Sequence, residues 1–309
     1  MIRTRLPIAI LLGLAVFGAG LGLAQSPPDS PRYVGSKVCA DCHGPIFEAW
    51  SKSHHALAWQ TPDEASVIGD FNDASITHKG VPSRFFRRGD KFVVETDGPD
   101  GKLKDYEVHS VAGIEPLQQY LLEVEPGRLQ ALDLSWDAKA KRWYHLYPEQ
   151  DLKGGDGLHW TGPYKNWNAR CAECHATGYE KKYEPRTRSY ASTQAEIGVG
   201  CEACHGPGEA HLAWAKQPEE KATKSQSRLS DKGFTLAFTP KDAETEIQQC
   251  AGCHSRRGPF DEKSPLPGTP FHDSYRLALL RDGLYHADGS IQDEVYVYGS
   301  FLQSKMYDK

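Results

Sequence analysis

Cys39-Ala-Asp-Cys42-His43 is the first of four short stretches that decide how this chain folds. The other three are Cys171-Ala-Glu-Cys174-His175, Cys201-Glu-Ala-Cys204-His205 and Cys250-Ala-Gly-Cys253-His254. They are called motifs 1 to 4 in chain order. Together they use all eight cysteines of the 309 residues, and a histidine follows every pair. C-x-x-C-H is the attachment pattern of c-type haem, so the sequence predicts four covalently attached haem c groups.

The spacing within each motif suits the attachment chemistry. Two intervening residues set the thiols about one helical turn apart, and the thiols can add to the two vinyl groups on one porphyrin edge. The histidine that follows supplies the proximal nitrogen to iron. We therefore expect haem attachment through Cys39, Cys42, Cys171, Cys174, Cys201, Cys204, Cys250 and Cys253, and proximal ligation by His43, His175, His205 and His254.

Other uses of eight cysteines explain the pattern less well. Two zinc sites or two iron–sulfur clusters would use all the thiols, but neither accounts for a histidine after every pair. Disulfides across two-residue gaps would close very short loops and add little stability. A thioredoxin-type C-x-x-C would occur once, near a βαβ pattern.

The overall composition is that of an ordinary soluble globular protein, with 39% hydrophobic and 25% charged residues. It excludes a disordered chain, a collagen and a polytopic membrane protein. The formal net charge is −5 at pH 7. No basic surface therefore argues for nucleic acid as a partner.

The N-terminus has the pattern of an export signal. Arg3 and Arg5 precede an apolar run over residues 6–23, and Gly22-Leu23-Ala24 offers a small-x-small cleavage site. We expect a signal peptide over residues 1–24 and no membrane span after its cleavage. The alternative is an uncleaved anchor, because the run is just long enough to span a bilayer. Covalent haem attachment takes place outside the cytoplasm, so a periplasmic or extracellular location is expected.

The rest of the chain divides into three expected segments. Residues 25–60 carry motif 1 and a helix over residues 45–58, which begins at a proline. Residues 61–158 contain no cysteine and predict a β-rich insert, and residues 159–309 form a domain with motifs 2, 3 and 4. Strands are expected over residues 83–88, 91–96, 103–111, 129–136 and 142–147, which are rich in β-branched and aromatic side chains. The fold class is α+β with little regular secondary structure and a haem-packed core.

Four low-spin haems need four further axial ligands. Nine of the thirteen histidines are not proximal, and Met306 is the only methionine besides Met1, which favours bis-His ligation by elimination. His211 follows His205 beyond a tight turn and would ligate a neighbouring haem. His159 and His286 are further candidates, and the roles of His109 and His145 stay open. An ideal helix would bury His54 rather than His55.

Several stretches outside the motifs also form a recognisable pattern. They include Tyr33-Val-Gly-Ser36, Trp50-x-x-Ser53-x-His55, Pro116-Leu-Gln-Gln-Tyr120, His145-Leu-Tyr-Pro148, His159-Trp-Thr-Gly162, Gly200-Cys-Glu-Ala-Cys-His-Gly-Pro-Gly208, Cys253-His-Ser-Arg-Arg257 and Glu294-Val-Tyr-Val-Tyr-Gly-Ser-Phe-Leu-Gln-Ser304. The chain resembles the multihaem c-type cytochromes of the cytochrome c554 type, a group often fused to tetratricopeptide repeats.

The resemblance implies electron transfer through closely packed, mainly bis-His haems. It also implies that His55 is a distal ligand, and we rank His55 above His54 because serines at 51 and 53 weaken an ideal helix. In the resembled proteins, the Gly-Ser-Phe-Leu-Gln-Ser segment leads into further C-x-x-C-H motifs. We therefore expect either a C-terminally truncated piece or a natural short form.

Three functions compete for this pattern. The first is a tetrahaem electron carrier that docks with redox partner proteins. The second is an oxidoreductase that acts on a small nitrogen or sulfur compound at an open haem site, although all four motifs end in histidine rather than in a variant residue. The third is a subunit of an extracellular haem-conducting filament. The sequence favours the electron carrier, which has no catalytic residue, and leaves the oligomeric state open.

Overall fold

The computed structural model describes residues 32–217, 232–238, 243–278, 280–293 and 296–308. The expected signal peptide lies outside the described residues. Within the described ranges, no helix combines the length and the apolar character that a membrane crossing requires.

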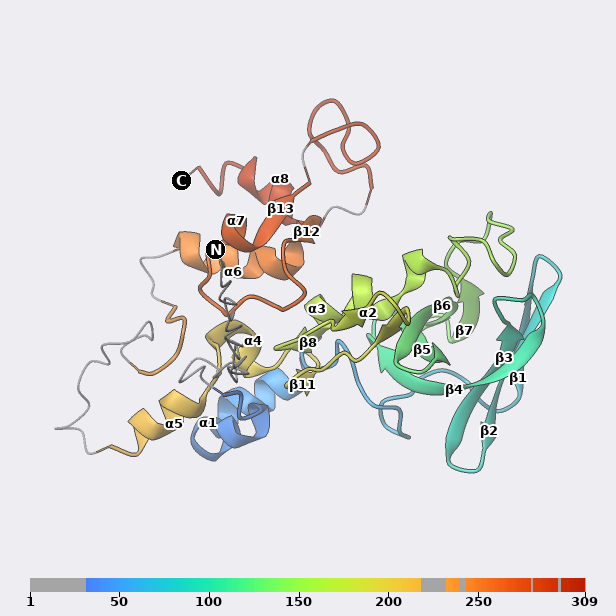
Figure 1. Cartoon of the computed structure of the whole chain (residues 1–309), viewed down its shortest axis with the longest axis horizontal. Helices are drawn as coiled ribbons and strands as arrows, with labels where there is room; N and C mark the ends of the chain where they lie inside the picture. The colour runs from blue at the N-terminus through green and yellow to red at the C-terminus, as the bar shows by residue number, and fades with distance from the viewer. Residues whose placement is uncertain (1–31, 218–231, 239–242, 279, 294–295, 309) are drawn as a thin grey trace, which may run out of the picture. The chain divides into compact units, whose positions relative to one another are not determined.

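Seven antiparallel strands form one sheet in which each strand pairs with its neighbours in the sequence (Figure 1). Such an order needs only short hairpin connections. The strands are β1 (Ala74–His78), β2 (Val81–Arg88), β3 (Lys91–Asp97), β4 (Leu103–Ala112), β5 (Leu117–Glu125), β6 (Arg128–Asp137) and β7 (Arg142–His145). All seven lie inside the expected β-rich insert.

Five of these strands match the sequence prediction, whereas β1 and β5 were not predicted. In β5 the adjacent Gln118 and Gln119 interrupt the apolar pattern. Gln118 is nevertheless fully buried. Its amide donates to the Ser66 and Gly113 carbonyls and accepts from the Ile68 N–H and the Tyr120 hydroxyl. A buried polar side chain with its hydrogen bonds satisfied is compatible with a core position.

An aromatic cluster fills the core of the sheet. Phe85 is fully buried, and its ring stacks on Trp143 with 3.5 Å between ring centroids. Phe71 makes edge contacts with Phe85, Phe92 and Trp143. Large aromatic side chains supply much of the apolar area that a small sheet can bury.

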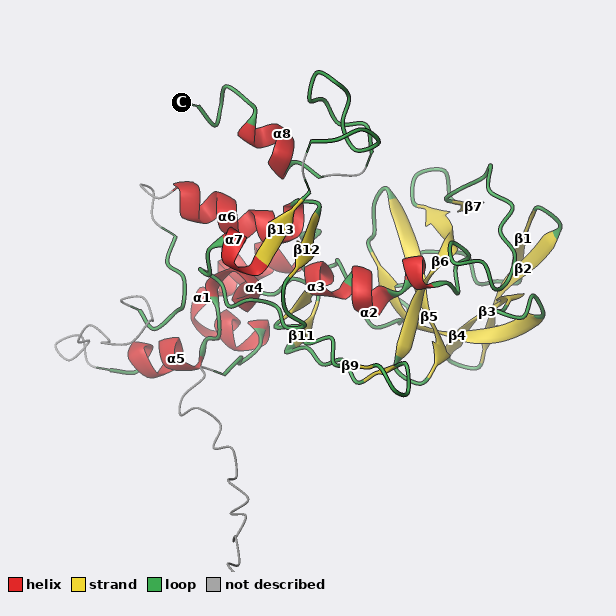
Figure 2. Cartoon of the chain, turned by 45° about the horizontal axis from the view of Figure 1, so that its top comes forward, coloured by secondary structure: helices red, strands yellow, loops and turns green. Residues whose placement is uncertain are grey.

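Short helices and two-stranded ladders make up the remaining regular structure (Figure 2). The helices are α1 (Ser36–Ser51), η1 (Pro163–Lys165), α2 (Trp167–Arg170), α3 (Ala172–His175), α4 (Cys201–His205), α5 (Glu209–Ala215), α6 (Ala243–His254), α7 (Phe271–Ser274) and α8 (Tyr298–Leu302). The ladders pair β8 (Ala176–Thr177) with β11 (Glu196–Ile197), β9 (Tyr183–Glu184) with β10 (Ser189–Tyr190), and β12 (Arg257–Pro259) with β13 (Tyr275–Leu277). The predicted α+β class with a β-rich region is confirmed.

The helix expected over residues 45–58 was wrong at both ends. α1 begins at Ser36, contains Pro45, and ends at Ser51. The Ser51 hydroxyl donates to the Glu48 carbonyl. The Ser53 hydroxyl then accepts from the Ala56 N–H. Serine side chains that bond to the backbone compete with helical hydrogen bonds, which explains the early end.

The segments that enter and leave the sheet both pair with it. Gln60 forms an antiparallel bridge with Val111 of β4, and Asn166 forms one with Gln130 of β6. The Trp59 indole N–H also donates to the Ser110 hydroxyl at 2.7 Å. The sheet therefore anchors the chain on the motif 1 side and on the motif 2 side.

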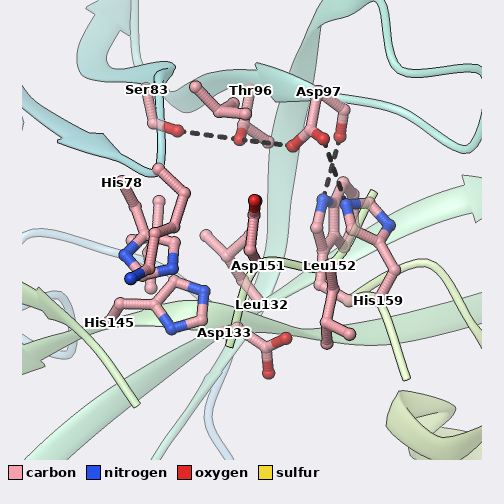
Figure 3. Close-up of a pocket in the computed structure, with 14 residues that line it drawn as sticks. His78, Ser83, Thr96, Asp97, Leu132, Asp133, His145, Asp151, Leu152 and His159 are labelled. Carbon is pink, nitrogen blue, oxygen red and sulfur yellow. Dashed lines mark hydrogen bonds and ion pairs between the residues drawn. The ribbon is translucent and has the colours of Figure 1, made fainter. Parts of the chain in front are cut away.

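A small cavity of about 40 Å³ opens beside strands β1, β3, β6 and β7 (Figure 3). His78 and His145 stack at its edge with 3.8 Å between ring centroids. His145 Nδ1 accepts from the Tyr147 N–H. Burial, and next the charge that His78 can carry, lower the pKa of His145 to about 4. The folded protein therefore favours a neutral ring at this position.

The stacked aromatic pair provides a test of the core. Phe85→Ala should lower the free energy of unfolding by about 3–5 kcal/mol, because it removes a fully buried ring and leaves a cavity against Trp143. Denaturant unfolding followed by circular dichroism measures the change. Phe260→Ala is the matched control, since this phenylalanine is 64% exposed. Equal losses in the two variants would contradict the assigned core.

The buried histidine provides a second test. The pKa of His145 is about 4 in the folded chain and about 6.5 when unfolded. The unfolded state thus binds more protons between these values, and stability falls as the pH drops from 6.5 towards 4. His145→Asn keeps an acceptor for the Tyr147 N–H but does not titrate. Unfolding curves from pH 7 to 4.5 should show a smaller loss in this variant, whereas parallel losses would contradict the assignment.

Candidate haem-binding site

Each C-x-x-C-H motif occupies about one helical turn, as its spacing predicts. Motif 1 lies within α1, and motif 3 coincides with α4. Motif 2 combines Cys171 with α3, and motif 4 forms the end of α6. His175, His205 and His254 each end their helix, and at His43 the backbone leaves helical geometry with φ −114° and ψ 37°. The backbone therefore turns at every proximal histidine.

The four motifs approach one another in an order that differs from the sequence. The Cys201 N–H donates to the hydroxyl of Ser36 in the motif 1 helix, which joins motif 1 to motif 3. Arg257 donates to Glu173 of motif 2 and to the Gly252 carbonyl of motif 4, which joins motif 2 to motif 4. All eight cysteines are free of disulfides.

Motifs 3 and 4 are also neighbours. The side chain of Gln249, directly before motif 4, donates to the carbonyl of Ala203 inside motif 3 at 3.1 Å. The motifs therefore form one series in the order 1, 3, 4 and 2.

A buried glutamate inside motif 3 holds the approach to motif 1. Glu202 is 1% exposed. Its carboxylate accepts from the N–H groups of Val34 and Gly35, directly before α1, at 2.7 to 3.1 Å. It also accepts from the Gly208 N–H at 2.7 Å. One side chain thus joins the segments that flank two haem motifs.

A serine at the start of α1 adds a second link between motifs 1 and 3. The Ser36 hydroxyl donates to the Glu196 carboxylate at 2.6 Å and accepts from the Cys201 N–H at 3.0 Å. In Figures 1 and 2, α1 and α4 lie side by side. Motif 3 therefore begins directly against the N-terminus of the motif 1 helix.

A buried ion pair joins motif 2 to motif 4. Arg257 donates to the Glu173 carboxylate of motif 2 at 2.8 Å and to the Gly252 carbonyl of motif 4 at 2.8 Å. The Tyr275 hydroxyl donates to the other Glu173 oxygen at 2.8 Å. Both contacted motif residues lie between the two cysteines of their motif.

Sequence reasoning missed these linking residues. The C-x-x-C-H motif specifies only the two cysteines and the histidine, and Glu173 and Glu202 occupy positions that it leaves unspecified. Their one local signal is an acidic side chain between the cysteines, which motif 1 also has at Asp41 and which motif 4 lacks. The partners, Arg257 and Val34, lie 84 and 168 residues away in the sequence. No local pattern indicates such pairs.

Two of the motif histidines have a predicted distal histidine as a ring neighbour. The His43 and His211 rings have centroids 6.4 Å apart and an interplanar angle of 24°. The His254 and His55 rings have centroids 6.2 Å apart and an angle of 64°. The Nδ1–H of His211 donates to the Lys232 carbonyl at 2.8 Å, which leaves Nε2 for a metal.

The other two proximal histidines have different neighbours. His175 donates its Nδ1–H to the Ala58 carbonyl at 2.9 Å, and its ring centroid lies 4.9 Å from that of Trp167. His205 lies 5.7 Å from Phe234 and 5.4 Å from Phe238, measured between ring centroids. Burial lowers the pKa of both histidines, which favours the neutral form that binds metals.

The remaining predicted ligands lie elsewhere. His159 lies in the cavity of the sheet, where Figure 3 shows it facing Asp97. Its Nε2 contacts the Asp97 carboxylate at 3.1 Å, and its Nδ1 contacts the Thr161 hydroxyl at 2.8 Å. Both nitrogens are therefore engaged within the protein. His286 is exposed in a turn closed by the Gly289 N–H, and the geometry adds no support for either as an iron ligand.

Two buried polar atoms near the proximal histidines fit the presence of a further group. The Trp167 indole N–H and the Thr235 hydroxyl have no hydrogen-bond partner among the described residues. Trp167 packs on His175, and Thr235 lies against Gly206, directly after His205. Buried donors of this kind normally have an acceptor, and a haem with its propionates would supply acceptors there. The residues present thus fit haem c.

Comparison with known proteins supports the same interpretation. Residues 38–79 and 134–206 match the family model for cytochrome c554 and c-prime. The dissimilatory sulfite reductase MccA of Wolinella succinogenes is 24% identical over 213 aligned residues, which cover 57% of this chain and 30% of that protein. The chain thus spans less than a third of this relative.

Two solved structures are also similar. The outer cell wall cytochrome OcwA aligns over 88% of this chain and 51% of its own, with a TM-score of 0.57 and 18% identity. The undecaheme cytochrome from the S-layer of Carboxydothermus ferrireducens aligns over 75% of this chain and 26% of its own, with a TM-score of 0.43 and 21% identity. The likeness to OcwA shows a common fold. The chain resembles the multihaem c-type cytochromes of the cytochrome c554 type, as its motifs predict.

Proposed function

We propose that this protein is a tetrahaem c-type cytochrome that carries electrons between redox partner proteins outside the cytoplasm. The observation that carries the proposal is the series of motifs 1, 3, 4 and 2, in which hydrogen bonds link each motif to the next, directly or through Ser36, Gln249 and Arg257 beside them. Haem c, when bound, supplies an iron that accepts and donates one electron. The contacts between motifs keep the attachment sites close together, as electron transfer requires.

The spacing of two pairs of histidine rings supports bis-His ligation at motifs 1 and 4. Two imidazoles on opposite sides of one metal place their ring centroids roughly 6.3 Å apart, given a metal–nitrogen bond of about 2 Å. The pairs His43–His211 and His254–His55 are separated by 6.4 and 6.2 Å. We assign His211 and His55 as the distal ligands at motifs 1 and 4, and this ranks His55 above His54. His159 and His286 remain predicted distal ligands, and neither is assigned to a particular haem.

The proposed location outside the cytoplasm rests on two observations. Residues 1–24 have the composition of an export signal. The similar structure OcwA is described as an outer cell wall cytochrome. The partners would be redox proteins, and the formal net charge of −5 favours basic docking surfaces on them.

A second candidate function is reduction of a small sulfur or nitrogen compound at motif 2 or motif 3. The observation that favours it is that, among the described residues, the ring neighbours of His175 and His205 are Trp167, Phe234 and Phe238 rather than a second histidine. The similarity to a sulfite reductase points to the same chemistry. The chain spans only part of that enzyme, so we rank this function second.

The holoprotein itself tests the first function. Intact mass and haem absorbance should give four haems per chain, and electron paramagnetic resonance should show low-spin iron. Sulfite, nitrite or cyanide should leave the spectra unchanged. A high-spin signal that disappears on adding one of these ligands would favour the reductase instead. Fewer than four haems would contradict the tetrahaem assignment.

The neighbouring histidines of residues 54 and 55 test the ligand assignment. His55→Ala should convert one haem of the four to high-spin iron, because it removes the ring opposite His254. His54→Ala is the matched control and should keep the wild-type spectrum. Electron paramagnetic resonance and visible spectra measure both. A high-spin signal from the His54 variant alone would reverse the assignment.

A further inference from the structure

Arg257 and Glu173 form a charged pair at the contact of motifs 2 and 4. The side chains are 8% and 19% exposed, and Arg257 Nη1 lies 2.8 Å from Glu173 Oε2. The guanidinium also lies over the Tyr275 ring, with 4.1 Å to the ring centroid. Two charges held this far from water interact more strongly than a surface pair.

The pair lies directly against the haem attachment points. Arg257 Nη2 is 3.5 Å from the Cys174 sulfur, and Arg257 Nε donates at 2.8 Å to the carbonyl of Gly252, directly before Cys253 of motif 4. Glu173 directly precedes Cys174 in the sequence. Each charge is therefore close to the edges of both haems that these cysteines would carry.

Tyr275 completes the arrangement on the acidic side. Burial, together with the adjacent Glu173 carboxylate, raises the pKa of Tyr275. Its hydroxyl therefore stays protonated and donates to Glu173 at 2.8 Å. Glu173 thus receives one neutral and one charged donor, which fixes the carboxylate beside the attachment cysteine.

We propose that Arg257 and Glu173 are positioning residues that set, with opposite signs, the reduction potentials of the haems at motifs 2 and 4. This inference rests on the proposed function. Reduction at each site adds one electron from a redox partner, with no bond made or broken. A buried positive charge stabilises the added electron, whereas a buried negative charge opposes it.

A purely structural link would behave differently. The hydrogen bonds of Arg257 to Glu173 and to Gly252 hold the two motifs together whatever their effect on the haems. If that were their whole role, loss of either charge would loosen the same contact and change the potentials in the same way. Opposite shifts separate the electrostatic role from the mechanical one.

The experiment compares charge-removing variants by spectroelectrochemical titration of the holoprotein. Glu173→Gln should shift two of the four potentials upward, and Arg257→Gln should shift two downward. Arg257→Lys keeps the charge, so its potentials should stay nearer to those of the wild type. The potentials of the double Gln variant should lie between those of the two single variants. Arg256→Gln is the matched control, because this neighbouring arginine is 42% exposed and pairs with Asp293.

The outcomes distinguish this inference from the proposed function. A wild-type protein without haem would overturn both, whereas four haems with no shift, or with shifts of one sign, would overturn only the inference. If the Arg257→Gln protein cannot be produced, the Glu173→Gln variant alone tests the inference. An upward shift of two potentials, with haem count and unfolding midpoint unchanged, supports the inference, and an unchanged or lower potential overturns it.

Discussion

The buried carboxylate of Glu202 is the interaction on which the arrangement of the motifs depends. Removing a carboxylate from water is unfavourable unless hydrogen bonds replace the lost hydration. Here backbone N–H groups of Val34, Gly35 and Gly208 supply those bonds. Because two of these groups precede α1 and one follows α4, the carboxylate can be satisfied only when motifs 1 and 3 are together. The facing rings of His43 and His211 depend on the same approach.

The contact of motifs 2 and 4 also uses a glutamate between two cysteines, but at the second rather than the first intervening position and with different partners. Glu173 binds a guanidinium and a phenol rather than backbone N–H groups. Backbone donors cannot be exchanged by substitution, whereas side-chain donors can. A substitution can therefore change the charge of the donor that binds Glu173, at the contact of motifs 2 and 4. It cannot replace the backbone donors that bind Glu202, at the contact of motifs 1 and 3.

Local patterns in the sequence were sufficient for part of this structure. The C-x-x-C-H spacing predicted the helical turns, and segments rich in β-branched and aromatic side chains predicted five of the seven strands. Strand β5 was not predicted because it contains the polar residue Gln118. Only the structure shows that this side chain is buried with four hydrogen bonds. The approach of His55 to His254 could not be predicted from spacing, because it depends on contacts between distant segments. The hydrogen bonds of His159 to Asp97 and Thr161 were missed for the same reason.

The pairing of the sheet with the chain at Gln60 and Asn166 bears on the order of assembly. Each of the seven strands finds its partner among its neighbours in the chain, and such local pairings form faster than distant ones. In the folded sheet, these bridges hold residues 60 and 166 against the same sheet, although 106 positions separate them in the sequence. Formation of the sheet would therefore bring the segment that follows motif 1 close to the segment that precedes motif 2.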